Sequence, residues 1–449
     1  MTQRFFDCSV PECQRPSARA VGGGCDMCSS YFCGVHMSRD YHKCSTGDLD
    51  DAAYEALIAA EIGRLRAQIN DKAVCEFASS LNDGRPCVIE YPSEVVGSGA
   101  LTGCANYHAR IRFGDEAPSW LMRVPRVSGF AVGLPVSLAE YLVRSEYATL
   151  KFLETTAVPA PRAFSFGIPS EGTDHGIGVC FLLMEELSGK PWHGQGDAAK
   201  VWEGLAEIFV ELEKHPFTKA GSLYVESPDD QPRVSATASD RFVCLYPYGP
   251  FETSVAYYSA WAEQYLALIA DGQLYPQFPV EAYLVYRFLQ DNATQLSDRE
   301  GEFFLKHVDD KGDHLMVDED LNITGIIDWQ MARIVPRREA FALSFVSADM
   351  GALCDGHISL GAQDVALRNA VHEKAPGLAS HMGNEKVRRF FWGLGLETKW
   401  VYALPLANAI LGIFGVKQGW DGWKEIALKQ YAGDVRLEAV MEGASGNRH

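Results

Sequence analysis

Apolar residues recur every three to four positions over residues 48–71, which predicts an amphipathic helix. Its first turn is rich in aspartate, and acidic side chains stabilise that end of a helix. We expect this helix to link the N-terminal residues to the next domain and to pack on that domain. Its apolar stripe consists of Tyr54, Ile58, Ile62, Leu65 and Ile69.

Alternating apolar and polar positions replace the helical spacing after residue 105 and predict two strands, 107–113 and 120–124. The glycines Gly97, Gly99 and Gly103 precede the first strand. A glycine loop beside a strand hairpin lets backbone N–H groups approach phosphates. Ordinary turns are the alternative explanation for these glycines.

A helix is predicted over residues 137–155, and it carries a carboxylate on its apolar face. Glu146 shares that face with Leu142 and Leu150. A buried carboxylate needs a cationic partner, and Arg123 on the preceding strand is the candidate. The alternative is an exposed Glu146 on an imperfect apolar stripe.

An apolar strand over residues 179–184 leads into the polar, glycine-containing segment 185–189. Such a transition is typical of a hinge between two lobes. We expect the backbone of this hinge to hydrogen-bond the edge of an adenine ring.

Residues 303–329 contain the most informative pattern. His307, Asp309 and His314 form the spacing H-x-D-x4-H, and the strands 315–317 and 323–327 follow. Asp328 and Trp329 come directly after the second strand. The hairpin predicts that Asp309 and Asp328 meet at one edge, where phosphoryl transfer would need one carboxylate to orient the acceptor hydroxyl and another to hold Mg2+. Acidic residues in ordinary turns are the alternative, and they account well for residues 318–320.

The C-terminal half is predicted to be helical over residues 198–214, 254–268 and 279–296, and again beyond residue 330. Residues 400–416 form an apolar run without charge, at the short limit for a membrane span. Because the run contains Pro405 and Asn408, we expect a buried helix. Most of the aromatic residues in this half are expected in the core.

Composition narrows the class of protein. The chain has 449 residues, is 47% hydrophobic and 22% charged, and carries a formal net charge of −19. It is long enough for two to four domains with a large core. The acidic balance argues against a nucleic-acid partner. The first residues lack the apolar core of a signal peptide, so we expect a cytoplasmic or nuclear protein with no membrane partner.

Half of the cysteines lie before residue 45 and are interleaved with two histidines. Without a secretory signal, a dense Cys/His cluster indicates metal binding. Eight ligands suffice for two tetrahedral zinc ions, whose binding would supply most of the folding energy of so short a segment. The alternative is a set of unrelated thiols. The candidate ligands are Cys8, Cys13, Cys25, Cys28, Cys33, His36, His42 and Cys44.

The spacing of these ligands resembles the AN-one-type zinc finger of stress-associated and ubiquitin-pathway proteins. The resemblance implies a cross-brace, in which alternate ligand pairs share an ion. One zinc would bind Cys8, Cys13, Cys33 and His36, and the second would bind the remaining four ligands. Both sites would be closed, so the finger would be structural or would dock a protein partner. Four residues separate the first two cysteines, where many members of that family have two.

From about residue 90 to 350 the chain resembles the aminoglycoside phosphotransferase family, a branch of the protein-kinase-like fold, and most resembles its fungal members. The resemblance rests on Glu146, on Val-Pro-Ala-Pro at 158–161, and on the segments 183–185, 307–314 and 325–329. It implies an α+β, two-lobed protein-kinase-like fold with ATP and Mg2+ in the cleft and a small-molecule hydroxyl as acceptor.

The resemblance also implies roles for individual residues. Asp309, with His307 nearby, would be the catalytic base, and Asp328 the main Mg2+ ligand. Two residues depart from the family pattern: Arg123 replaces the phosphate-binding lysine, and His314 replaces a metal-ligating asparagine, for which Asp313 would substitute. The implied nucleotide-binding residues are Gly97, Gly99, Arg123, Glu146, Glu185 and Leu187.

Together these patterns predict four parts: a finger at 1–46, a linker helix at 47–74, an N-lobe at 75–187 and a C-lobe at 188–449. The predicted activity is ATP-dependent phosphate transfer to a small molecule, with two structural zinc ions. The alternative is a kinase-like adaptor of little or no activity, recruited through the finger to ubiquitin-pathway or chaperone partners. The two departures favour that alternative.

Overall fold

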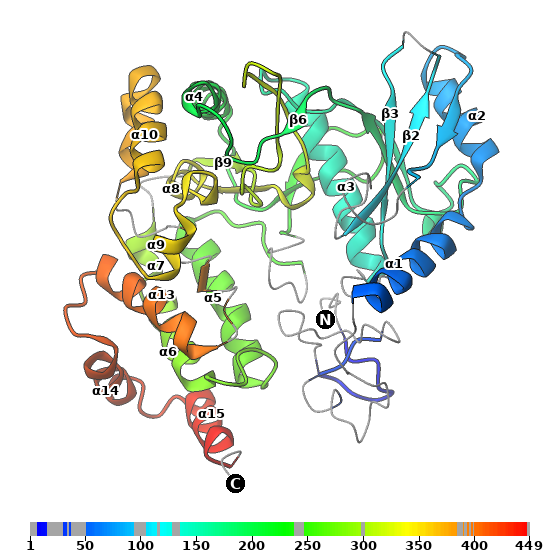
Figure 1. The fold of residues 1–449 in the computed structure, drawn as a ribbon. Coiled ribbons are helices and arrows are strands. Elements are labelled where there is room, and N and C mark those ends of the chain that lie inside the picture. The colour runs from blue at the N-terminus through cyan, green and yellow to red at the C-terminus, as the bar shows by residue number, and fades with distance from the viewer. Residues whose placement is uncertain are drawn as a thin grey trace.

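The computed structural model describes residues 7–15, 30–33, 36, 51–93, 105–114, 117–127, 135–237, 247–297, 301–383, 389, 393–394, 397 and 399–446. One end of the molecule is built on a five-stranded antiparallel sheet in the order β1-β2-β3-β5-β4 (Figure 1). The strands are β1 (Val88–Glu90), β2 (Asn106–Arg112), β3 (Trp120–Pro125), β4 (Ala163–Gly167) and β5 (Phe181–Glu185).

The alternation predicted for β2 is confirmed. Tyr107, Ala109 and Ile111 are buried on one face of the sheet, where they pack against Ile62 and Leu65 of the N-terminal helical segment. The predicted packing of that segment on the next domain is therefore also confirmed.

The prediction of one continuous helix over residues 48–71 is wrong. Helix α1 (Asp51–Arg66) ends before a short turn, and α2 (Asp71–Leu81) begins after it. Asn70 is the cause, because its side chain accepts a hydrogen bond from the N–H of Ala73 and caps the new helix. Residues 48–50 and the side chain of Tyr54 lie outside the described residues.

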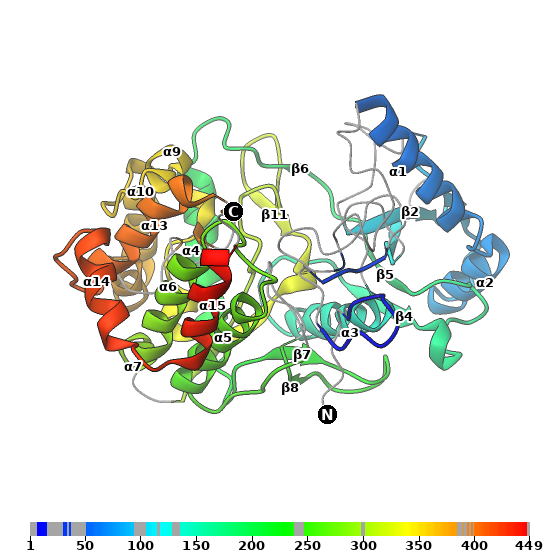
Figure 2. The same ribbon diagram turned by 90° about the horizontal axis from the view of Figure 1, so that it is seen from below.

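Helix α3 (Val136–Leu153) lies against the other part of the sheet and is buried along most of its length. It also packs against the hairpin of β7 (Ser222–Tyr224) and β8 (Arg233–Ser235), which belongs to the second lobe (Figure 2). The hydroxyl of Tyr147 donates to the carbonyl oxygen of Pro228 at 3.0 Å. Helix α3 is therefore held from both lobes.

The second lobe is mainly helical. The predicted helix over 279–296 is interrupted at Asn292, where α6 gives way to the short α7. The helices are α4 (Ala199–Glu213), α5 (Ser254–Ala270), α6 (Pro279–Asp291), α7 (Ala293–Leu296), α8 (Arg337–Ala340), α9 (Met350–Cys354), α10 (Ala362–Lys374), α11 (Pro376–Ala379), α13 (Trp400–Ile413), α14 (Trp420–Gln430) and α15 (Val435–Gly446).

Two small sheets contain the strands that flank residues 307–314. β10 (Leu315–Val317) pairs with β11 (Ile323–Ile326) and with β6 (Lys190–Pro191). β9 (Phe303–Lys306) pairs with β12 (Arg333–Pro336). The ends of β9 and β11 therefore lie in one region, from which the candidate site is built.

The apolar run that begins at Trp400 forms α13, with Pro405 inside the helix. Leu406 and Ile410 are buried in the main core, as predicted for a core helix. Among the described residues, none of the helices combines the length and the apolar character needed to cross a membrane.

Candidate active site

Three elements converge on Arg123. Its side chain extends from β3 and is only 6% exposed. The Nε atom lies 3.2 Å from Oε2 of Glu146 on α3, and Nη2 donates to Oδ1 of Asp328, after β11, at 2.5 Å. The predicted pairing of Arg123 with Glu146 is confirmed, and the alternative of an exposed Glu146 is wrong, because Glu146 is buried.

This group has more acidic side chains than basic ones, since one cation faces two carboxylates. Burial raises the pKa of Glu146 to about 7; Arg123 opposes this rise, and the charge of Asp328 adds to it. Burial also acts to raise the pKa of Asp328, but the guanidinium of Arg123 outweighs burial and holds that pKa below its usual value. Asp328 is therefore the more firmly ionised of the two acids.

Asp328 occupies a sharp turn. Its backbone is left-handed, with φ 64° and ψ 53°, at the start of the short helix Trp329–Met331. That conformation is uncommon for a residue with a Cβ, and surrounding contacts must maintain it. The buried indole of Trp329 supplies one, because its Nε1 donates to the carbonyl of Ile326 at 2.9 Å. The backbone N–H of Trp329 also bonds the carboxylate of Glu146. Half of the Asp328 side chain remains exposed.

Two stacked histidines join the loop at residues 307–314 to the end of β11. The rings of His307 and His314 lie 4.2 Å apart and nearly parallel. Nε2 of His307 lies 2.9 Å from the carbonyl oxygen of Ile327, and the N–H of Ile327 donates to the carbonyl of His314. Residues 307 and 314 therefore fix the position of Asp328 through its neighbour.

His314 is almost completely buried, and its Nδ1 lies 3.4 Å from the backbone N–H of Gly312. Burial lowers the pKa of this imidazole well below its usual value, and the charges of His307 and Lys311 lower it further. The ring is therefore neutral at neutral pH.

Asp309 lies two residues beyond His307, and its side chain is 28% exposed. The Lys311 ammonium lies 3.4 Å from Oδ1 of Asp309 and 3.9 Å from Oδ2 of Asp313. The structure thus places Asp309, Asp313 and Lys311 in one short loop that begins beside the His307–Ile327 contact.

The predicted hinge follows β5. The Glu186 carboxylate accepts two hydrogen bonds from Arg110, at 2.7 and 2.5 Å, and a third from the hydroxyl of Ser119. The side chain of Leu187 lies so close to Gly325 that a Cβ there would come within 2.2 Å of it. The hinge is therefore tied to the sheet on one side and to β11 on the other.

Sequence reasoning missed Gln330 and Asn106, two buried residues beside Arg123. The Nη2 atom of Arg123 donates to Oε1 of Gln330 at 3.2 Å, and the carboxamides of Gln330 and Asn106 lie 2.9 Å apart. Neither residue belongs to a spacing pattern; the position of Gln330 directly after Asp-Trp was the one available signal. The predicted phosphate-binding residues Gly97 and Gly99 lie outside the described residues.

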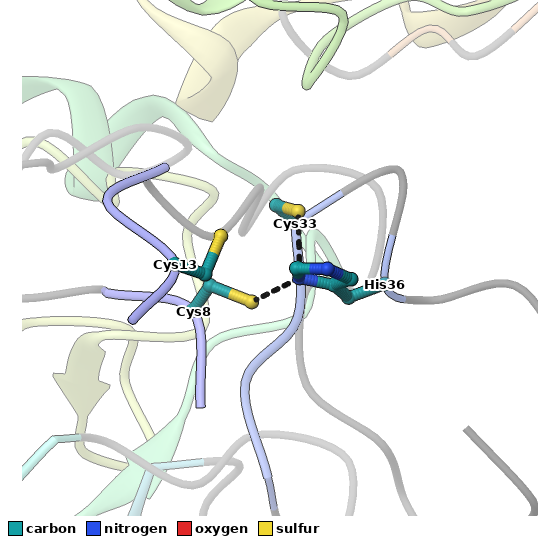
Figure 3. Close-up of side chains that lie close together, drawn as sticks. All are labelled: Cys8, Cys13, Cys33 and His36. Carbon is teal, nitrogen blue, oxygen red and sulfur yellow. Dashed lines mark hydrogen bonds between the residues drawn. The ribbon is translucent and has the colours of Figure 1, made fainter. Parts of the chain in front are cut away.

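A second cluster lies in the N-terminal segment. Figure 3 shows Cys8, Cys13, Cys33 and His36 pointing toward one another, and their ligand atoms all lie within 4.8 Å of each other. Nδ1 of His36 is 3.2 Å from Sγ of Cys8 and 3.5 Å from Sγ of Cys33. Sulfur and nitrogen ligands of a tetrahedral zinc ion are separated by about 3.6 Å, so these residues fit zinc. The other predicted ligands, Cys25, Cys28, His42 and Cys44, lie outside the described residues.

Comparison with known proteins identifies the family. The model of the phosphotransferase enzyme family, abbreviated APH, matches residues 108–352, more than half of the chain. The chain belongs to this family. The matched residues include most of β2, all of β3 and α3, the hinge and the loop of Asp309. The match therefore covers Arg123, Glu146 and Asp328 but not Asn106.

Solved structures of phosphotransferases resemble the chain over most of its length. An aminoglycoside phosphotransferase candidate from Ralstonia eutropha JMP134 is 13% identical, with a TM-score of 0.42 over 84% of this chain and 99% of that one. A GDP complex of an aminoglycoside 2'-phosphotransferase-IIIa variant is 14% identical, with a TM-score of 0.41 over 85% and 100% of the two chains. No curated protein matches significantly. The family assignment rests on the match over residues 108–352 alone.

Proposed function

We propose that this family member transfers the γ-phosphate of ATP to a hydroxyl group of a small molecule. The observation that carries the proposal is the convergence of Arg123, Glu146 and Asp328 from three elements within the matched region. Arg123 is the only one of the three with a positive charge, and a triphosphate would attract it. Glu146 would hold the guanidinium in position while the phosphates bind.

Two carboxylates would supply oxygen ligands for Mg2+. The carboxylates of Asp328 and Asp313 are each about half exposed, at 49% and 54%, and Mg2+ prefers oxygen to nitrogen. Mg2+, when bound with the nucleotide, would neutralise charge on the phosphates. His314 is the poorer candidate, because its ring is buried against His307.

Asp309 is the proposed catalytic base. It would accept the proton of the acceptor hydroxyl and orient that oxygen toward the phosphate. The Lys311 ammonium lies 3.4 Å from its carboxylate. His307 would act as a positioning residue, since its contact with Ile327 joins the loop of Asp309 to Asp328.

The hinge and the glycines complete the proposed nucleotide site. An adenine edge would bind the backbone at Glu185–Leu187; within the described part of the chain, no hydrogen bond involves the N–H of Leu187. Gly97 and Gly99 would approach the phosphates through their backbone N–H groups. Zinc bound by the N-terminal ligands would be structural, because Cys3His sites are closed to substrate.

The direct test compares Asp309→Asn with Asp320→Asn, a matched change in an exposed turn. Phosphate transfer from ATP is measured over a panel of hydroxyl acceptors that includes aminoglycosides and uncharged sugars. Asp309→Asn should lower transfer at least 100-fold, the scale typical of lost general-base catalysis, while nucleotide affinity is kept. Normal turnover in this variant would remove Asp309 from the role of base.

The second candidate is a kinase-like adaptor without turnover, which the N-terminal segment would recruit to a protein partner. The observation that favours it is the direct bond between Arg123 and Asp328, which engages both groups that a nucleotide complex would need. A thermal-shift titration with ATP and Mg2+ separates the two. At 100 times the dissociation constant, a bound nucleotide stabilises the fold by about 2.7 kcal/mol. No shift at millimolar nucleotide would favour the adaptor.

A further inference from the structure

The N-terminal segment is packed on the first lobe by the side chain of Tyr31. This ring contacts an apolar cluster on α3 formed by Leu138, Ala139 and Leu142, all of them buried. Figures 1 and 2 agree in placing the segment beside one end of α3. The segment therefore packs directly on α3, independently of any ligand or partner that it binds.

Tyr31 is tied to both halves of the Cys/His cluster. Its carbonyl accepts from the N–H of Ser9 at 2.6 Å, and its own N–H donates to the Ser9 hydroxyl at 2.8 Å. Ser9 follows the ligand Cys8, and Tyr31 lies two residues before the ligand Cys33. The position of the Tyr31 backbone therefore depends on the cluster.

Among the described residues of the segment, the apolar core beside the cluster is small. It consists of Cys8, Phe32 and Cys33, with Val10 and Cys13 beside them. A core of this size does not stabilise a fold without a metal or a cross-link. A zinc ion on the four ligands would close the segment and fix the backbone on which Tyr31 is mounted.

Helix α3 connects this contact to the candidate active site. Glu146 lies one helical turn beyond Leu142, so both side chains share a face of the helix. Glu146 in turn pairs with Arg123 and bonds the N–H of Trp329. A displacement of this part of α3 would therefore separate Glu146 from Arg123.

A contact with the second lobe is weaker. Nε of Arg15 lies 3.5 Å from Oδ1 of Asp271, at the end of α5, and both side chains are partly exposed. Exposed pairs of this kind contribute little to stability. The contact of Tyr31 with α3 is therefore the one that matters, and Arg15 supplies a matched control in the same segment.

We propose that zinc bound by Cys8, Cys13, Cys33 and His36 stabilises α3 through Tyr31, and so maintains the geometry of the Arg123–Glu146 pair. The finger is thus an internal brace of the phosphotransferase fold as well as a candidate surface for partners. The effect on nucleotide affinity rests on the proposed function, whereas the effect on α3 does not.

The test uses the full chain and three measurements: zinc content, hydrogen exchange of the amides at 138–146, and affinity for ADP with Mg2+. Tyr31→Ala should keep its zinc, while exchange at 138–146 becomes at least tenfold faster and ADP binds severalfold more weakly. Cys33→Ser should lose one zinc and show the same two changes. Arg15→Ala, the conservative change Tyr31→Phe, and Cys354→Ser at an exposed cysteine of α9 should stay within twofold of the original chain.

Unchanged exchange at 138–146 in Tyr31→Ala, or in Cys33→Ser after loss of zinc, would overturn the proposal. Full zinc content in Cys33→Ser would overturn it as well, because the proposed site would not be the one occupied. Faster exchange in both variants, with no ADP binding even to the original chain, would support the brace and remove the proposed nucleotide site. The two proposals therefore fail in different measurements.

Discussion

At the scale of single residues, the guanidinium of Arg123 joins two carboxylates that lie on different elements. The planar fork reaches Glu146 through Nε and Asp328 through Nη2 at the same time. A lysine offers one compact charge and cannot span two carboxylates on different elements in this way. One side chain therefore holds Glu146 and Asp328 together.

Removing the charge of Arg123 should destabilise the fold. In Arg123→Met the carboxylate of Glu146 stays buried without its cation, and breaking a buried pair costs about 3–5 kcal/mol. We expect the free energy of unfolding, measured by urea denaturation at pH 7, to fall by about 3 kcal/mol. Arg112→Met, an exposed arginine at the end of β2, should change it by less than about 1 kcal/mol.

The double variant Arg123→Met with Glu146→Gln separates charge from packing. If the cost arises from the unpaired carboxylate, neutralising Glu146 should recover part of the loss. A double variant no more stable than Arg123→Met alone would show that the pair contributes mainly by filling space.

At the scale of elements, local patterns predicted most of what the structure shows, because β2, α3 and β10 follow from alternation or helical spacing within a few residues. The break at Asn70 was missed even though the capping residue is visible in the sequence, since the apolar stripe continues through it. The pairing of β9 with β12 and of β6 with β10 depends on contacts between distant segments, which no local pattern contains.

The candidate site likewise has one contact that the sequence predicts and others that only the folded chain shows. The cost of burying Glu146 predicted its pairing with Arg123, because both lie on neighbouring elements. The bond from Arg123 to Asp328 joins residues that lie 205 positions apart, and only the folded chain brings them together. The burial of His314 was equally invisible, since it results from stacking on His307.

Helix α10 offers a prediction about pH. Its buried residue Asp364 accepts from Nη1 of Arg389 at 2.8 Å, from the hydroxyl of Ser347 at 2.7 Å and from the N–H of Gly361 at 3.0 Å. Burial acts to raise the pKa of Asp364, but Arg389 and Ser347 outweigh burial and lower it. A lowered pKa means that the stabilisation is present above about pH 4, the ordinary value for aspartate, and is lost as the pH falls through the folded-state pKa.

Asp364→Asn should therefore lower the free energy of unfolding by about 3 kcal/mol at pH 7, and this difference should shrink below pH 4. Denaturant titrations at pH 7, 5, 4 and 3 measure it, with Asp355→Asn, at an exposed residue after α9, as the control. A difference that stays constant down to pH 3 would mean that ionisation of Asp364 does not contribute.

At the scale of the whole molecule, an N-terminal segment, a sheet-based lobe and a helical lobe meet around α3. The hairpin of β7 and β8 holds this helix from the second lobe, and Tyr31 contacts it from the N-terminal segment. A helix held from three directions keeps Glu146 in place without a ligand. In such an architecture, metal binding in the N-terminal segment is coupled to the rest of the fold through α3.

The purified chain should contain two zinc ions if the eight predicted ligands form two sets of four, as their cross-brace spacing predicts. Elemental analysis of the full chain measures the ratio, and Cys8→Ser and Cys25→Ser should each lower it by one. A ratio of one in the original chain, unchanged in Cys25→Ser but abolished in Cys8→Ser, would leave the four ligands of Figure 3 as a single site. A ratio of zero would contradict the finger altogether. Two ions lost together in either variant would contradict the predicted loss of one and show that the two sites fold as one unit.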